Sequence, residues 1–217
     1  MDVFRLEEFR PQWMVVAGGE PAGAEELRRW SRRAGGRVVC CDGAAVAAID
    51  AGIAPTAIVG DGDSLPPEMV KRYRDIFVRV SEQETNDLTK AVDYIERSGG
   101  AEQLVVLGAT GRREDHTLGN ISLAIDYYRE RGIRAVMPTP YGVFIPCRGG
   151  VAIAAGRGRE VSVFNLAGAA GFRARGLQYP LPHEFTALWQ GTLNVATEDV
   201  VEIEARGYYI VYIANPD

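Results

Sequence analysis

Three acidic segments in the first half of the chain hold residues whose types and spacing suit metal and phosphate chemistry. They are Gly60-Asp61-Gly62-Asp63-Ser64, Thr85-Asn86-Asp87 and Gly108-Ala109-Thr110-Gly111-Arg112-Arg113-Glu114-Asp115-His116. Clustered carboxylates repel one another unless cations compensate, and Mg²⁺ favours a few carboxylates combined with phosphate oxygens and water. Glycine and arginine beside the acids indicate a phosphate ligand. Metal-assisted phosphoryl chemistry is therefore the first hypothesis.

The elements that must position these residues alternate between strand and helix. Short apolar runs predict strands, and the amphipathic stretches between them, several ending at glycine, predict helices. Strands are expected at residues 13–17, 37–41, 57–60, 76–80, 104–108 and 134–138, and helices at 24–34, 43–51, 67–74, 87–98 and 117–131. This order predicts an α/β domain with a mostly parallel sheet in a Rossmann-like, three-layer arrangement. Loops at the carboxyl ends of such strands gather at one sheet edge, where ligands bind.

The pattern changes after residue 138, where long helical stretches stop. Short alternating runs predict strands at residues 142–145, 151–154, 160–164, 185–189, 192–197, 200–204 and 208–213. Short strands with close turns are typical of an all-β sandwich or barrel. We therefore expect two domains, an α/β domain at residues 1–141 and a β domain at residues 142–217.

Asp61 and Asp63 directly follow the third expected strand. In an extended turn alternate residues point the same way, so the two carboxylates would hold one metal ion or two neighbouring ions. The alternative is a solvated turn in which Asp63 or Ser64 caps the helix introduced by Pro66-Pro67.

Asp87 and Asp42 each stand at the expected start of a helix. Thr85 or Asn86 would cap the helix that Asp87 opens, and an acid suits the positive first turn of a helix. The same place would also serve a metal ion bridged to phosphate. Asp42 is interpreted either as a helix cap or as part of a fourth loop at the same sheet edge.

The glycine-arginine loop predicts phosphate binding more strongly. Gly108, Thr110 and Gly111 would present backbone N–H groups, and Arg112 and Arg113 would present guanidinium groups. The loop is not a Walker A loop, which ends in Lys-Ser/Thr, and its glycines lack the spacing of a dinucleotide fingerprint. The alternative is a surface turn with solvated arginines.

The two histidines do not support nucleophilic triad chemistry. Asp115 and His116 are adjacent, and adjacent residues seldom orient one another. His183 lies between Pro182 and Glu184 in an expected surface turn. The chain also lacks a Gly-x-Ser-x-Gly nucleophile elbow.

Composition restricts the partners and the location. The chain has 217 residues, 47% of them hydrophobic and 24% charged, with a formal net charge of −5, so no overall basic field attracts nucleic acid. The N-terminus does not resemble a signal peptide, and no apolar run approaches the roughly 20 residues of a membrane-spanning helix. Cys40, Cys41 and Cys147 lack disulfide or metal-site spacing and are expected to be buried thiols in a cytoplasmic protein.

Taken in order, the segments resemble those of the thiamine pyrophosphokinase family. That family carries an Asp-Gly-Gly/Ala block, a Gly-Asp-x-Asp-Ser block, a Thr-x-Asp block at a helix start and a Gly-x-x-Gly-x-Arg-x-Asp-His block. The chain matches them with Asp42-Gly43-Ala44 and the three acidic segments, and Gly176-Leu177-Gln178-Tyr179-Pro180-Leu181 is similar to the family's Gly-Leu-Lys-Tyr/Trp-Pro-Leu segment. Each block is weak alone, but five in order are specific and span nearly the whole chain.

The resemblance implies a homodimer with active sites between subunits, an α/β catalytic domain and a β-sandwich that binds the vitamin. The implied reaction is Mg²⁺-dependent transfer of diphosphate from ATP to the hydroxyl of thiamine, giving thiamine diphosphate and AMP. The implied catalytic residues are Asp61, Asp63 and Asp87, which hold Mg²⁺ directly or through water, and Asp115, a further ligand or the group that orients the hydroxyl. The implied ATP and phosphate site contains Asp42, Gly108, Thr110, Gly111, Arg112 and Arg113, and the vitamin site contains Tyr179, Thr192 and Asn194.

The chain departs from the family pattern at two points. It has Gly111-Arg112-Arg113 where the family often has Gly-Gly-Arg, and Leu193 where the family usually has the serine of a Ser-Asn pair. Thr192 is available to replace that hydroxyl. Two alternatives follow: a diphosphotransferase for another heterocyclic alcohol such as a hydroxymethylpterin, and a non-catalytic protein that binds nucleotide or thiamine diphosphate.

Overall fold

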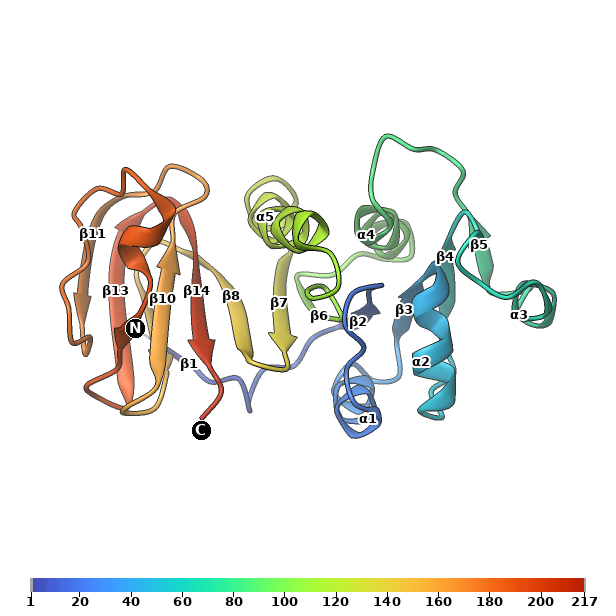
Figure 1. Ribbon diagram of the computed structural model, residues 1–217, viewed down its shortest axis with the longest axis horizontal. Helices are drawn as coiled ribbons and strands as arrows, with labels where there is room; N and C mark the ends of the chain where they lie inside the picture. Colours follow the sequence, from blue (N-terminus) through green and yellow to red (C-terminus); the bar gives the residue numbers. More distant parts are fainter. Residues whose placement is uncertain (1, 217) are drawn as a thin grey trace. The chain divides into compact units, whose positions relative to one another are not determined.

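The computed structural model describes residues 2–216, which form two compact units (Figure 1). The α/β unit contains residues 10–123 and 132–139, and the β-rich unit contains residues 2–9, 124–131 and 140–216. The expected domain boundary between residues 141 and 142 stays a prediction. The compact units are not the same as the expected domains, because residues 2–9 and 124–131 belong to the β-rich unit.

Six parallel strands form the sheet of the α/β unit, in the order β7-β6-β2-β3-β4-β5. Their bounds are β2 Trp13–Val16, β3 Val38–Cys41, β4 Ala57–Gly60, β5 Phe77–Arg79, β6 Gln103–Leu107 and β7 Arg134–Thr139. Every residue of β2, β3 and β4 is buried, as expected for strands that are covered on both faces. This confirms the predicted mostly parallel sheet.

Helices cover both faces of this sheet, with α4 on one face and α1 and α2 on the other (Figure 1). The bounds are α1 Ala24–Arg33, the 3₁₀ turn η1 Asp42–Ala44, α2 Ala45–Asp50, α3 Pro67–Arg72, α4 Asp87–Arg97 and α5 Glu114–Arg131. The buried face of α4 includes Leu88, Ala91, Val92 and Ile95. This three-layer arrangement is the predicted one, although α5 begins three residues earlier than expected.

The strands of the β-rich unit pair in two sets, the four-stranded sheet β1-β9-β13-β11 and the antiparallel set β12-β10-β14-β8. Their bounds are β1 Val3–Phe4, β8 Gly142–Arg148, β9 Val151–Ala154, β10 Glu160–Phe164, β11 Ala170–Arg175, β12 Asn194–Val195, β13 Val200–Arg206 and β14 Tyr208–Ala214. Phe172 of β11 and Tyr209 of β14 join the two sheets through an edge-to-face ring contact at 5.3 Å. The sandwich predicted for this half is confirmed.

The strand expected at residues 185–189 is wrong. The chain bends there and then forms the 3₁₀ turn η2 Leu188–Gly191. Gln190 causes the bend, because its Oε1 accepts hydrogen bonds from the backbone N–H groups of Thr186 at 2.7 Å and Ala187 at 3.0 Å. Those N–H groups are therefore not available to a neighbouring strand.

No helix within residues 2–216 combines the length and the apolar character needed to cross a bilayer.

Candidate functional site

Three carboxylates meet at the carboxyl ends of β3 and β4. Asp42, Asp61 and Asp63 each offer an oxygen, and the three oxygens lie within 4.8 Å of one another. Cys41 pairs with Val59 in the parallel register, which brings Asp42 beside Gly60. A Cβ on Gly60 would lie only 2.7 Å from the Cβ of Asp42, so glycine is what permits this approach.

Asp42 is the buried member of this group, with 2% of its surface exposed. Its Oδ2 accepts a hydrogen bond from the Ser64 N–H at 3.1 Å, whereas its Oδ1 has no hydrogen-bond partner within residues 2–216. Burial raises the pKa of Asp42 above its ordinary value, and the neighbouring acids Asp63, Asp61 and Asp87 raise it further. A buried, unpartnered carboxylate oxygen beside two other acids fits a cation ligand.

Asp61 and Asp63 lie closer to the surface. The N–H of Asp63 donates to Asp61 Oδ1 at 3.1 Å, and Gln83 Nε2 donates to Asp61 Oδ2 at 3.2 Å. The Ser64 hydroxyl donates to Asp63 Oδ1 at 2.9 Å. The donation from Asp63, followed by that from Gln83, lowers the pKa of Asp61, so its carboxylate is ionised at neutral pH.

The start of α4 is fixed by side chains from its own first turn and from α5. Asn86 caps the helix by accepting from the Thr89 N–H at 2.9 Å, and its amide donates to Asn120 Oδ1 at 3.0 Å. Asn120 in turn donates to the Ala109 carbonyl at 2.7 Å. This chain of hydrogen bonds ties the N-terminus of α4 to the loop that follows β6.

Asp87 begins α4 and is contacted from two sides. Burial raises the pKa of the Cys41 thiol well above its ordinary value, so the thiol stays protonated and donates to the Asp87 carbonyl at 3.4 Å. The Asp87 carboxylate is about half exposed and lies 3.4 Å from Lys90 Nζ. The side chain of Lys90 is only 4% exposed.

The glycine-arginine loop is built against the loop that follows β2. The N–H groups of Gly19 and Glu20 donate to the carbonyls of Gly108 and Thr110, both at 2.7 Å. A Cβ on Gly19 would lie within 2.5 Å of both carbonyl oxygens, so only glycine fits there. The Arg112 guanidinium donates to the Gly18 carbonyl at 3.2 Å.

Gly108, Gly111 and Arg112 all have positive φ, at 66°, 80° and 62°. Arg112 is therefore a non-glycine residue in the left-handed region, a conformation that is uncommon and concentrated at functional sites. The turn is fastened from α5, because Thr117 Oγ1 accepts from the Gly111 N–H at 3.1 Å and donates to the Arg113 carbonyl at 3.0 Å.

Asp115 lies at the start of α5 in an exposed ion pair with Arg113. Two guanidinium nitrogens of Arg113 donate to the two carboxylate oxygens, at 3.1 and 2.6 Å. This pairing is the main cause that holds the pKa of Asp115 at about 2. Asp115 is thus ionised at neutral pH and is a weak base.

A cavity of about 640 Å³ brings most of these groups together. Its lining includes Asp61, Asp63, Asp87, Lys90 and Arg112. The cavity therefore places carboxylates and positively charged side chains around one space that is large enough for a polyphosphate chain.

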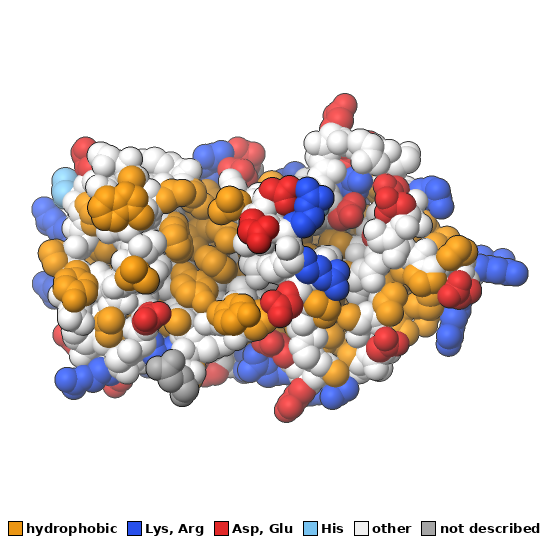
Figure 2. All heavy atoms as spheres, viewed as in Figure 1, with side chains coloured by type: hydrophobic (Ala, Val, Ile, Leu, Met, Phe, Trp, Pro, Cys, Tyr) orange, Lys and Arg blue, Asp and Glu red, His pale blue; other side chains and the backbone are white. Residues whose placement is uncertain are grey.

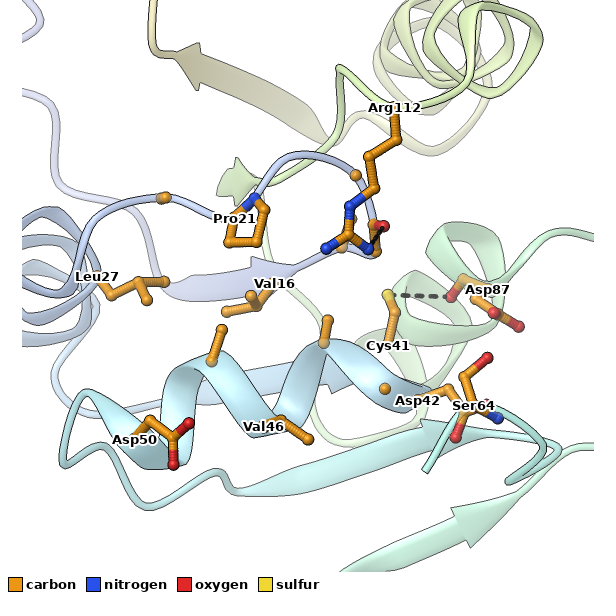
Figure 3. Close-up of a pocket in the computed structure, with 17 residues that line it drawn as sticks. Val16, Pro21, Leu27, Cys41, Asp42, Val46, Asp50, Ser64, Asp87 and Arg112 are labelled. Carbon is orange, nitrogen blue, oxygen red and sulfur yellow. Dashed lines mark hydrogen bonds between the residues drawn. The ribbon is translucent and has the colours of Figure 1, made fainter. Parts of the chain in front are cut away.

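A second cavity, of about 430 Å³, shares part of that lining, including Cys41, Asp87 and Arg112 (Figure 3). In Figure 3, the Arg112 side chain extends to the loop after β2, where its guanidinium donates to the Gly18 carbonyl. The remaining wall is more apolar and includes Val16 and Leu27. The two cavities thus place a polar region beside an apolar one.

The expected vitamin residues lie in the β-rich unit. Asn194 is buried, and its carboxamide accepts from the Tyr179 N–H at 3.0 Å and donates to the Tyr179 carbonyl at 2.8 Å. The Thr192 hydroxyl donates to the Trp189 carbonyl at 2.7 Å. Asn194 and Thr192 therefore shape the segment that presents Tyr179 and Trp189.

Hydrophobic side chains reach the surface of the β-rich unit (Figure 2). The large exposed ones include Leu193 at 77%, Trp189 at 73% and Tyr179 at 55%. Leu193 also has a positive φ of 59°, which is unusual for a leucine.

Sequence reasoning missed several residues that line the first cavity: Gly18, Gly19, Lys90 and Asn120. The glycine pair after an apolar run was a signal for a ligand-binding turn. Lys90 and Asn120 gave no such signal, since each lies inside a helical pattern and reaches the cavity only through packing.

Two domain families match the sequence: "Thiamin pyrophosphokinase, catalytic domain" over residues 32–137 and "Thiamin pyrophosphokinase, substrate-binding domain" over residues 142–212. Together they cover most of the chain. The chain belongs to the thiamin pyrophosphokinase family. A rice protein named thiamine pyrophosphokinase 1 (Oryza sativa subsp. japonica) is 38% identical over 92 residues, a stretch that covers 38% of this chain and 34% of the rice protein. The match thus spans about a third of that relative's length.

Solved structures of family members share the fold. The thiamine pyrophosphokinase of Bacillus subtilis aligns over 94% of this chain and 99% of its own, with 20% identity and a TM-score of 0.75. The yeast enzyme aligns over 93% of this chain and 85% of its own, with 17% identity and a TM-score of 0.79.

Proposed function

We propose that this protein transfers diphosphate from ATP to the hydroxyl of thiamine, giving thiamine diphosphate and AMP. The observation that carries the proposal is the convergence of Asp61, Asp63 and Asp87 with the glycine-arginine loop around one cavity, in a chain that belongs to this family. The proposed catalytic domain is residues 1–141, and the proposed vitamin-binding domain is residues 142–217.

The residues around the first cavity fit a magnesium ion. Asp61 and Asp63 are the proposed ligands, and Asp42 joins them because its buried Oδ1 lacks a partner among the described residues. Asp87, which the family resemblance also assigns to the metal, lies on the same cavity but beside Lys90. When bound, Mg²⁺ would neutralise negative charge on the polyphosphate.

The transfer forms one bond and breaks another at the β-phosphorus of ATP. The thiamine oxygen bonds to that phosphorus as its hydroxyl proton passes to solvent, the bond to the oxygen shared with the α-phosphorus breaks, and AMP leaves with the electron pair. Because Asp115 is a weak base, its proposed part is to orient Arg113 toward phosphate rather than to remove the hydroxyl proton. Positioning and charge neutralisation supply most of the catalysis in such reactions.

The proposed phosphate site uses the loop after β6 and the end of β3. Gly108 and Gly111 shape the backbone, Thr110 supplies a main-chain carbonyl to the loop after β2, and Arg112 and Arg113 provide guanidinium groups. Asp42 is the proposed link between this site and the cation.

The proposed vitamin site contains Tyr179, Thr192 and Asn194. Tyr179 is exposed and available for stacking, while Asn194 and Thr192 hold the segments on either side of Leu193.

The family also motivates the proposal of a cytoplasmic homodimer whose active sites lie between subunits. Sedimentation would test the dimer, and mixing Asp61→Ala with Tyr179→Ala subunits would restore activity only if each site uses both chains.

One assay tests the proposed function against its alternatives. The protein is incubated with ATP, Mg²⁺ and thiamine, and AMP and thiamine diphosphate are quantified. Both products are expected. AMP formed with a hydroxymethylpterin but not with thiamine would select the other diphosphotransferase. Tight nucleotide binding with no AMP from either alcohol would select the binding protein.

A further inference from the structure

The sheet β1-β9-β13-β11 has an exposed, charged face where β11 pairs with β13. Glu204 of β13 is opposite Arg173 of β11 in the antiparallel register. Arg206, the next exposed residue on that face of β13, is opposite Ala170 and meets no acid there. The pairing of opposite charges across the two strands therefore ends in an excess of positive charge.

A hollow of about 290 Å³ opens at that end of the face. Its lining consists of Gly171, Arg173, His183, Glu204, Ala205 and Arg206. Two guanidinium groups and an imidazole thus share a small space with a single carboxylate. Neither guanidinium has an ion-pair or hydrogen-bond partner within residues 2–216, so the donors of both are available to a ligand.

A β-bulge in β11 brings His183 to this hollow. The register with β13 shifts between Ala170 and Arg173. The N–H groups of the two intervening residues, Gly171 and Phe172, both donate to the His183 carbonyl, at 3.1 and 3.0 Å. Bulges of this kind often redirect side chains beside binding sites. Here the bulge fastens residue 183 to the end of β11.

Gly171 also fixes the place of the Arg206 guanidinium. Gly171 has a positive φ of 73°, and a Cβ at this residue would lie 3.0 Å from Nη1 and 3.4 Å from Cζ of Arg206. The guanidinium therefore packs directly against the glycine backbone, in space that a side chain would fill. A group that is already held in place loses less freedom when a ligand binds.

The chemistry of this hollow suits an anion with several oxygens. Guanidinium groups donate parallel pairs of N–H groups, which phosphate oxygens accept. Glu204 offsets one of the two guanidinium charges and leaves the other for the ligand. We propose that the hollow binds a phosphate group, either inorganic phosphate or the phosphate end of a small monoester. The site belongs to the β-rich unit and shares no lining residue with the cavity that contains Asp61.

Histidine NMR on the intact protein tests this proposal directly. The chain has only two histidines, and His116 lines the larger cavity whereas His183 lines the hollow. Protein labelled with ¹⁵N-histidine gives one set of ring signals for each, and His116→Gln assigns them. Inorganic phosphate at constant pH in chelator is expected to shift the His183 signals saturably. An equal response to sodium chloride at the same ionic strength would mean that the arginines attract any anion, and would overturn the proposal.

Three variants measure the contribution of each charge. Arg206→Gln is expected to raise the phosphate concentration that gives half of the His183 shift about tenfold. Glu204→Gln should lower that concentration about threefold, because it removes a like charge from the anion's surroundings. Arg175→Gln, two residues from Arg173 on the same strand and outside the lining, is the matched control and should bind phosphate like the wild type.

The gain expected from Glu204→Gln keeps the test decisive, since a misfolded protein would not bind more tightly. Weaker binding in that variant, or unchanged binding in Arg206→Gln, would contradict the proposal.

The source of the phosphate group is distinguished by a second titration. Glycerol phosphate that shifts the His183 signals at a lower concentration than inorganic phosphate would identify a monoester as the ligand. The opposite order would identify inorganic phosphate. Failure of both to shift these signals would reject the site.

Failure of the proposed function is distinguishable from failure of this inference. A saturable His183 shift in a protein that forms no thiamine diphosphate would sustain the site and reject the enzyme assignment. Formation of thiamine diphosphate by a protein whose His183 signals ignore phosphate would do the reverse.

Discussion

At the scale of single residues, Asp42 carries an unfavourable charge that the rest of the fold tolerates. Its Oδ1 is buried without a partner among the described residues, and burial raises its pKa. Asp42→Asn removes the charge, keeps an oxygen for the Ser64 N–H and suits the positive φ of 39°. In chelator we expect this variant to be more stable than the wild type by about 1 kcal/mol, measured by urea unfolding.

In the presence of Mg²⁺ the wild type should be more stable than Asp42→Asn. Ligand binding to the native state stabilises it, so Mg²⁺ should raise the melting temperature of the wild type more than that of Asp42→Asn. Asp75→Asn, at an exposed position outside the acidic group, is the control and should behave like the wild type. A metal-free Asp42→Asn protein that is less stable than the wild type would contradict the assignment.

The Arg113–Asp115 pair gives a second prediction at this scale. Arg113 holds the pKa of Asp115 at about 2, so the favourable contribution of the pair is present above the ordinary aspartate pKa and is lost as pH falls through about 2. Arg113→Gln should return the pKa of Asp115 toward its ordinary value, measured by carboxyl-carbon NMR. Arg112→Gln should leave it at about 2, because Arg112 contacts the Gly18 carbonyl instead.

At the scale of elements, the loop after β2 and the loop after β6 act as one structure. A side chain at Gly19 would collide with the carbonyls of Gly108 and Thr110, whereas nothing lies within 4 Å of a Cβ at Gly18. Gly19→Ala should therefore displace the glycine-arginine loop, lower stability by about 1–3 kcal/mol and weaken ATP binding. Calorimetric titration with ATP and thermal unfolding would measure both effects.

Gly18→Ala provides the matched control in the same loop. It should retain the stability of the wild type, because a Cβ at this position meets no atom within 4 Å. Equal behaviour of the two variants would show that the two loops are independent.

The sequence predicts the α/β elements well because their signals are local. The strand expected at residues 57–60 is β4, and the helix expected at 87–98 is α4 apart from its last residue. The two-residue strand β1 was missed because it is too short to show alternation, and β11 because a glycine and a register shift interrupt it. The strand expected at residues 185–189 does not form, because the Gln190 side chain accepts a hydrogen bond from the Thr186 N–H, which a neighbouring strand would need.

The candidate site shows the same limit. Its acids could be named from their positions after strands, yet the meeting of Asp42 with Gly60 depends on the register between β3 and β4. Lys90 was hidden because the apolar stripe of α4 explains that helix without it. Long-range register and burial are properties of the folded chain, and a single sequence does not state them.

At the scale of the whole molecule, the β-rich unit depends on its first few residues. Val3 and Phe4 pair with Ala152 and Ile153 of β9, and Phe4 packs on the ring of Phe9 at 5.7 Å. Deleting residues 2–5 should expose the edge of β9. Amide hydrogen exchange in β9 is expected to accelerate about tenfold or more, because the strand loses a neighbour.

The strands of the α/β unit provide the internal reference for this deletion. Exchange in β3 and β4 should stay within error of the wild type, since β1 forms no part of their sheet. Uniform acceleration across the chain would instead mean that the deletion lowers global stability.

The pairing of β1 with β9 also has a consequence for biosynthesis. Val3 leaves the ribosome long before its partner Ala152, and at about 5–20 residues per second the interval is on the order of ten seconds. During that time all six strands of the α/β unit are translated, whereas the first strand waits with its edge unpaired. Among the strands of residues 2–216, β1 is thus translated before all the others but pairs only after β9 has been made, and its edge is open to chaperones during that interval.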